Sequence, residues 1–302
     1  MAEEGRGLAS GAGLSATAVG IACGTGAALF WAAGLVAARH GIAIGLTPFD
    51  LVVHRYTWAG LAFLPLLARD RKTGIGAIGW WRAAALTLFA GPMLALFSYA
   101  GFILVPLGHG AVIQPSCATL GGLALATLVL GEPLRSRRLI GALAIVAGLM
   151  LLGAEALGTI GRRGLLGDLS FVAAGMSWAT FGILLRVWRI EPTRAVGVVN
   201  VLSLVLLPFY AVFIGFGNLI AAGWFENAVQ AVIQGILAGP VSIYLFARAV
   251  VLLGAGRAAV FTSLVPGFTL LIGFLALGEV PSIWQLAGLV VIALGFRLVI
   301  RA

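Results

Sequence analysis

Ionisable residues are scarce in this apolar chain, and the group best suited to chemistry begins at position 50. Asp50 and His54 are spaced i, i+4, which puts both on one face of a helix, and Arg55 follows directly. A charge carried into an apolar helix is costly and usually faces a cavity or a partner. One hypothesis is that these residues bind a substrate carboxylate, couple a proton or form a gate at the outer mouth of such a cavity. The other is a self-neutralising cluster that fixes the helix at the interface.

Polar aromatic residues near the middle of long apolar runs form a second group. Trp and Tyr normally gather at membrane interfaces, so a mid-run position favours the lining of a cavity. Each side chain combines an apolar body with one hydrogen-bonding tip, which suits a zwitterion, although ordinary helix packing gives the same pattern. Gln114 and Ser263, in matching helices, add an amide and a hydroxyl group that could contact a substrate. The alternative is that these groups form hydrogen bonds between helices. The predicted substrate-binding residues are Trp31, Tyr99, Gln114, Trp178, Tyr244 and Ser263.

Prolines interrupt several of the same apolar runs. A proline removes an intrahelical hydrogen bond and kinks the helix, which frees carbonyl groups that can contact a substrate near the midplane. The alternative is that the prolines shape the helices or act as hinges. Pro92 and Pro240 each follow a glycine, in corresponding runs of the two halves of the chain. The predicted hinge residues are Pro92, Pro115, Pro240 and Pro266.

The elements that must position these residues are apolar helices. The chain has 302 residues, of which 61% are hydrophobic and 10% charged, with a mean hydropathy of +1.11. Soluble domains carry about 25% charged residues. Apolar runs long enough to cross a bilayer as helix recur throughout, and in lipid the backbone must be satisfied within each helix. We therefore predict an all-α membrane protein with ten transmembrane helices, at roughly 16–38, 47–68, 80–103, 106–130, 137–154, 165–187, 194–216, 228–251, 256–277 and 282–300.

Charge predicts the orientation of these helices. With residues 1–15 as a cytoplasmic tail, most of the 19 Lys and Arg residues fall on the cytoplasmic side, as the positive-inside rule requires. Both termini are then cytoplasmic, in a bacterial-type inner (plasma) membrane. The net charge of +9 follows from this topology and from contact with anionic lipid head groups, so no nucleic-acid partner is expected.

The two halves of the sequence repeat each other. Five helices per half is an odd number, so the second copy is inverted relative to the first, as in many secondary transporters. The landmarks keep their order at an offset of 147 or 148 residues. They are Trp31 with Trp178, Gly91-Pro92 with Gly239-Pro240, Leu130-Gly131-Glu132 with Leu277-Gly278-Glu279, Gly141 with Gly288, and Gly148 with Gly295.

This doubled pattern resembles the EamA domain of the drug/metabolite transporter superfamily. The resemblance rests on a Trp in the first helix, an Arg in the second, a Leu-Gly-Glu end to the fourth and spaced glycines in the fifth, over 16–154 and 165–300. It implies two EamA-like repeats, a basket of ten helices around a central cavity, and similarity to exporters of amino acids and related small metabolites. Arg55 has no counterpart in the second half, because the corresponding position at an offset of 147 is Leu202.

The sequence predicts a secondary carrier that exports amino acids or related metabolites by alternating access. All ten acidic residues fall at helix ends or in loops of the predicted topology, which favours facilitated transport but leaves coupling through His54 open. A proton-coupled drug or nucleotide-sugar transporter is the alternative. We expect no enzymatic activity, cofactor or metal. The expected partners are a small-molecule substrate and membrane lipids, and the expected state is a monomer or weak oligomer.

Overall fold

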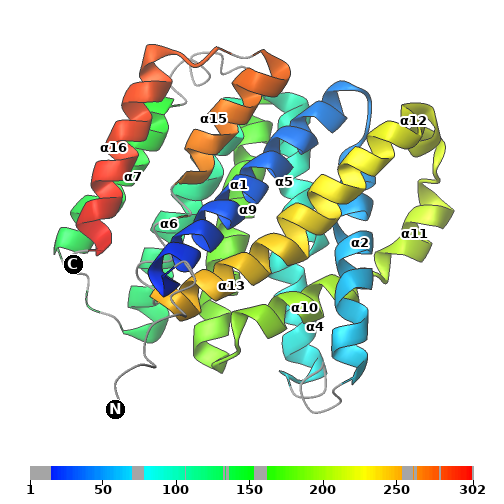
Figure 1. The fold of residues 1–302 in the computed structure, drawn as a ribbon, viewed down its shortest axis with the longest axis horizontal. Helices are drawn as coiled ribbons and strands as arrows, with labels where there is room; N and C mark the ends of the chain where they lie inside the picture. Colours follow the sequence, from blue (N-terminus) through cyan, green and yellow to red (C-terminus); the bar gives the residue numbers. More distant parts are fainter. Residues whose placement is uncertain are drawn as a thin grey trace, which may run out of the picture.

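The computed structural model describes residues 15–69, 78–105, 107–131, 133, 136–152, 162–253, 261, 264–278 and 280–300. This part of the chain is a bundle of helices without a strand (Figure 1). Described helices overlap each of the apolar runs predicted from hydropathy. The first half holds α1 (Ala16–Ala43), α2 (Pro48–Arg69), α4 (Trp80–Ala90), α5 (Pro92–Leu104), α6 (Leu107–Leu130) and α7 (Ser136–Leu152). The second half holds α9 (Arg162–Trp188), α10 (Pro192–Ser203), α11 (Leu206–Phe213), α12 (Gly217–Gln230), the π-helix η1 (Ala231–Val241), α13 (Ser242–Leu253), α15 (Leu264–Leu277) and α16 (Ile283–Ile300).

Hydropathy and length let much of this bundle cross a membrane. Within the described ranges, six helical segments are long and apolar enough to span it. The six are Ala16–Ala43, Trp80–Leu104, Ile113–Leu130, Gly164–Trp188, Pro192–Phe213 and Gly217–Leu253, and shorter apolar helices are Leu139–Leu151, Leu264–Ala276 and Ile283–Gly295.

Both predicted glycine–proline steps break their helices. At the first, α4 ends and α5 begins, and Gly91 has φ −94° and ψ −146°. At the second, Gly239 interrupts η1 with φ −92° and ψ −110°. A Cβ atom at Gly91 would overlap the carbonyl oxygen of Thr87, so the tight break admits only glycine. The two halves therefore carry closely similar kinks at corresponding positions.

The last helices of the two halves pack against each other through glycines. The α7 and α16 helices lie side by side at one edge of the bundle, opposite the edge that holds α11 (Figure 1). A Cβ atom at Gly148 would lie 2.7 Å from the carbonyl oxygen of Gly288, and one at Gly295 would lie 2.8 Å from that of Gly141. Small residues let membrane helices approach to backbone contact. The glycines that correspond between the repeats thus face each other in reciprocal pairs.

Candidate functional site

An arginine in the interior of the bundle forms the centre of the candidate site. The Arg55 guanidinium, on α2, interacts with the hydroxyl groups of Tyr56 and of Tyr99 on α5. Its Cζ atom lies 6.0 Å from the centre of the Tyr56 ring. Both tyrosines are buried, at 4% and 5% exposure, whereas Arg55 keeps partial exposure. No carboxylate in the described ranges forms an ion pair with Arg55.

Hydrogen bonds link this arginine to helices of both repeats. The Tyr99 hydroxyl donates to Oε1 of Gln234 on η1 at 3.3 Å. The amide nitrogen of Gln234 donates to the carbonyl oxygen of Gly34 on α1 at 2.8 Å. A side chain at Gly34 would meet Cβ of Ala238, so this glycine lets η1 lie close to α1. The site is therefore built where α1, α2 and α5 of the first half meet η1 of the second.

The predicted binding residues divide between interior and surface. Tyr99 is part of the interior group, and Gln114 on α6 approaches it by accepting a 3.0 Å hydrogen bond from Ser98. Trp31 is partly buried, with its ring 5.3 Å from that of Phe246.

Two other predicted residues do not join the interior group, and a third is not described. Trp178 is 50% exposed, and its ring lies 5.4 Å from that of Phe181. Tyr244 is 65% exposed on α13. Ser263 lies outside the described residues. A role in substrate binding stays a prediction for each of them.

Carbonyl groups next to the predicted hinge prolines Pro92 and Pro240 accept hydrogen bonds from side chains. Next to Pro92, the Ala90 carbonyl oxygen accepts a hydrogen bond from the Tyr56 hydroxyl at 3.2 Å. Next to Pro240, the Ser242 hydroxyl bonds the Ala238 and Gly239 carbonyl oxygens at 2.9 and 3.0 Å. A hinge role stays a prediction for both prolines. Pro115 and Pro266 lie within α6 and α15.

Asp50, the first member of the predicted cluster, binds neighbouring helices and makes no ion pair with Arg55. Its side chain is fully buried and accepts four hydrogen bonds. The Thr47 backbone N–H and hydroxyl donate at 2.7 and 2.8 Å, the Tyr210 hydroxyl at 2.5 Å and the Asn218 amide at 3.1 Å. Hydrogen bonds to a carboxylate are roughly twice as strong as neutral ones, and here they compensate its charge. Asp50 thereby ties the start of α2 to α11 and α12.

His54 is held in its neutral form by its neighbours. The Trp58 indole N–H donates to Nδ1 at 3.3 Å, so that nitrogen acts as the acceptor. Nε2 then carries the proton and donates to Oδ1 of Asn227 at 3.0 Å. The Asn227 amide nitrogen is committed to two carbonyl oxygens of α12, which fixes its oxygen toward His54. A second proton on His54 would face the Trp58 donor, so the hydrogen bonding disfavours coupling through this histidine.

Comparison with known proteins places the fold in a transporter family. The model of the EamA-like transporter family matches residues 18–154 and again 165–301. The chain belongs to the EamA-like transporter family. It is thus a membrane transporter of the drug/metabolite transporter superfamily. A solved structure described only as a crystal structure of a protein shares the fold, with 20% identity, a TM-score of 0.66, and coverage of 94% of this chain and 96% of the other. No curated protein matches the chain.

This EamA-like chain also contains a histidine–aspartate pair that the sequence did not indicate. Nδ1 of His109 on α6 lies 2.7 Å from Oδ1 of Asp168 on α9, and the side chains are 1% and 14% exposed. The pair joins a helix of the first repeat to the first helix of the second. With 59 residues between the two positions, sequence spacing could not have revealed it.

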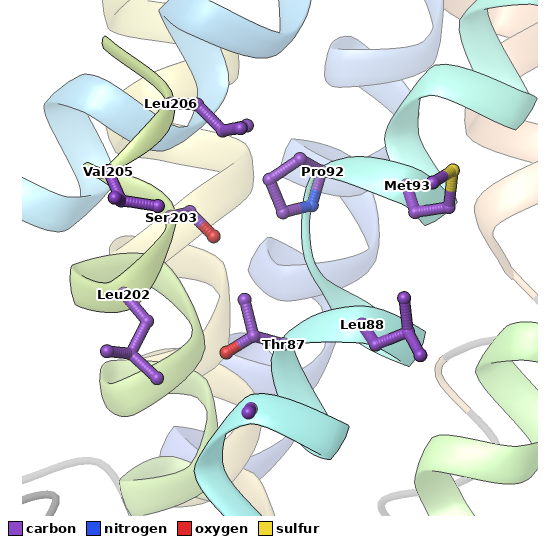
Figure 2. A pocket seen from close by; sticks show the side chains of 9 residues that line it. Thr87, Leu88, Pro92, Met93, Leu202, Ser203, Val205 and Leu206 are labelled. Atoms are coloured by element: carbon purple, nitrogen blue, oxygen red, sulfur yellow. The ribbon is translucent and has the colours of Figure 1, made fainter. Parts of the chain in front are cut away.

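A pocket of about 260 Å³ lies on the flank of the EamA-like bundle, between the kink at Pro92 and the break between α10 and α11 (Figure 2). Its two hydroxyl groups, of Thr87 and Ser203, donate to carbonyl oxygens of their own helices. Leu88 and Val205 at its rim are 54% and 61% exposed, on the apolar surface of the bundle. The pocket therefore suits apolar chains better than a charged solute, and the interior site around Arg55 is the better candidate.

Proposed function

We propose that this EamA-like transporter moves small carboxylate-bearing metabolites, amino acids foremost, out of the cytoplasm across a bacterial-type inner membrane. The observation that carries the proposal is the Arg55 guanidinium, which is turned inward without a carboxylate partner among the described residues. A charged residue inside a membrane bundle usually marks a substrate or ion pathway. Within the family, we propose the amino-acid exporter YddG as the nearest type, which agrees with this substrate class.

The chemistry of the site supports a carboxylate. Guanidinium groups bind carboxylates with two parallel hydrogen bonds, which gives both strength and a defined orientation. The hydroxyl groups of Tyr56 and Tyr99 lie beside Arg55 but already donate to the Ala90 carbonyl oxygen and to Gln234, so the guanidinium is the group that would bind the anion. A bound carboxylate would also neutralise a charge that is otherwise costly at this depth.

Alternating access would act through the kinks and the seal between the repeats. In the proposed topology, ten helices form two inverted repeats with both termini cytoplasmic, and Gly91 and Gly239 are equivalent hinge points. The hydrogen bonds of Asp50 and His54 join α2 to α11 and α12. We infer that they would close the end of the site that faces outward in this topology. Opening toward the outside would break these bonds, whereas opening toward the cytoplasm would leave them intact.

Uptake into vesicles that hold the purified protein tests the proposal. We expect saturable uptake of labelled L-leucine and L-phenylalanine that needs no pH gradient and stops when the internal and external concentrations are equal. Leucinamide, which lacks the carboxylate, should neither enter nor compete, because Arg55 would have no anion to bind. Equal transport of the amide and the acid, or no uptake of any carboxylate by folded protein, would refute the proposal.

Proton-coupled transport of drugs or nucleotide sugars is the second candidate, and the His109–Asp168 pair is the observation in its favour. Buried pairs of this type between helices are used as proton relays in pumps and transporters. An imposed pH gradient should then drive accumulation above equilibrium, and Asp168→Asn should abolish accumulation while leaving exchange at equal concentrations intact. On our first proposal, the gradient changes neither the rate nor the final level by more than about twofold.

A further inference from the structure

One buried hydrogen-bond acceptor near the site lacks a donor. Gln230, at the end of α12, is fully buried. Its amide nitrogen donates to the carbonyl oxygen of Ala37 on α1 at 2.8 Å. Its Oε1 atom has no hydrogen-bond partner in the part of the chain that the structure describes. Such an orphaned polar atom is rare in folded proteins and calls for a partner from outside the described part of the chain.

The orientation of this amide follows from chemistry. A carbonyl oxygen can only accept, so the group of Gln230 that faces Ala37 must be the amide nitrogen. The oxygen is therefore the group turned away from that carbonyl. Gln234, one turn further along the chain, has the same arrangement with Gly34, and its oxygen accepts from Tyr99. The two glutamines thus have the same arrangement, except that the oxygen of Gln234 accepts a hydrogen bond and the oxygen of Gln230 does not.

The orphaned oxygen belongs to a row of acceptors along one helix face. Glu226, Gln230 and Gln234 are spaced i, i+4, i+8, so they lie above one another on α12 and η1. The carboxylate of Glu226, at the exposed end of the row, lies 3.1 Å from Nε2 of His40. At the inner end, Gln234 connects through Tyr99 to Arg55. The row therefore runs from the surface toward Arg55. Its oxygen atoms are acceptors that suit a positively charged group of a substrate, and that of Gln230 is the one without a described donor.

We propose that Oε1 of Gln230 accepts a hydrogen bond from the primary ammonium group of the substrate while Arg55 holds its carboxylate. This inference rests on the proposed function and narrows it, because it selects zwitterionic amino acids over other carboxylates. One helical turn separates Gln230 from Gln234, about 6 Å along the axis. An amino acid with a hydrogen bond of about 2.9 Å at each charged end covers one such turn. The guanidinium of Arg55 lies beside the Tyr99 hydroxyl that contacts Gln234, so Arg55 would hold the carboxylate near the level of Gln234.

Matched analogues and a matched pair of variants test this assignment. In the vesicle assay we would compare L-leucine with 2-hydroxyisocaproate, which keeps the carboxylate and side chain but has a hydroxyl in place of the ammonium. Wild-type protein should favour L-leucine by roughly tenfold or more in kcat/KM, because a charged donor gains most from a buried acceptor. Gln230→Met should remove this preference, because it lowers L-leucine transport by roughly tenfold more than hydroxy-acid transport.

Gln234→Met is the control for a purely structural role. It removes an equivalent bond to α1, but its oxygen already has a donor, so both substrates should weaken together. A Gln230→Met variant that loses transport of both substrates equally would overturn the inference, as would wild-type protein that transports both equally well; the oxygen would then bind water.

The same experiment separates this inference from the proposed function. Transport of the hydroxy acid and L-leucine at equal rates would contradict the inference but would still support a carboxylate carrier. Failure to transport either acid would refute that function as well. If Gln230→Met does not fold, the wild-type preference alone decides.

Discussion

Arg55→Gln abolishes saturable amino-acid uptake while the protein stays at least as stable as the wild type. The guanidinium is the only group at the centre of the described site that can neutralise a carboxylate, and its loss should raise KM by roughly 10- to 100-fold or more. Its charge has no compensating carboxylate among the described residues, so removing it should not cost stability and can increase it. Uptake in vesicles and the thermal midpoint of the purified protein measure the two effects.

Arg137→Gln provides the matched control. Arg137 is exposed at the start of α7 and distant in sequence from the site, so the same substitution there should leave uptake within about twofold. Arg55→Lys separates charge from geometry. An ammonium group keeps the positive charge but lacks the planar fork, so partial recovery at a raised KM is expected. A variant Arg55→Gln that transports amino acids normally would contradict the carboxylate assignment.

Gly148→Ala and Gly295→Ala should each destabilise the bundle strongly. The new Cβ atoms would lie 2.7 Å from backbone atoms of the facing helix, Gly288 O and Ile145 N. Backbone cannot rotate away as a side chain can, so α7 and α16 must separate, and the cost should reach about 1–3 kcal/mol or more. The thermal midpoint in detergent should fall, and both variants should show it because the contacts are reciprocal.

Gly122→Ala on α6 serves as the comparison. A Cβ atom there meets nothing within 4 Å among the described contacts, and alanine favours helix over glycine by about 1 kcal/mol. This variant should be neutral or slightly more stable. If Gly148→Ala proved as stable as Gly122→Ala, the close packing of α7 on α16 would not be a feature of the protein in its membrane.

Much of the helical arrangement could be predicted because the signals are local. Apolar runs mark helices wherever they occur, and the glycine–proline steps break the helix through covalent geometry. The match of Gly141 and Gly148 with Gly288 and Gly295 predicted corresponding packing faces in the two halves. What the match could not show is that these faces pack against each other.

The candidate site was less predictable, because depth in a helix does not reveal direction. Tyr99 and Tyr244 both lie mid-run in corresponding helices, yet one is buried and the other is 65% exposed. Asp50, His54 and Arg55 are close in sequence, but consecutive positions on a helix point about 100° apart, so the arginine faces different partners. Gln230 and Gln234 are spaced i, i+4 in an apolar stretch, and this spacing is the sequence signal that indicates two polar side chains on one helix face.

The sequence by itself determined that this chain is a repeated set of apolar helices with an arginine at position 55 within the second of them. Composition, hydropathy and the 147-residue offset are properties of the chain that need no knowledge of contacts. Only the tertiary structure decided which polar groups meet. The bonds of Gln230 with α1, and of Asp50 with α11 and α12, cross 193, 160 and 168 residues of chain. Such contacts depend on how the inverted halves pack, and no local pattern of residues encodes that geometry.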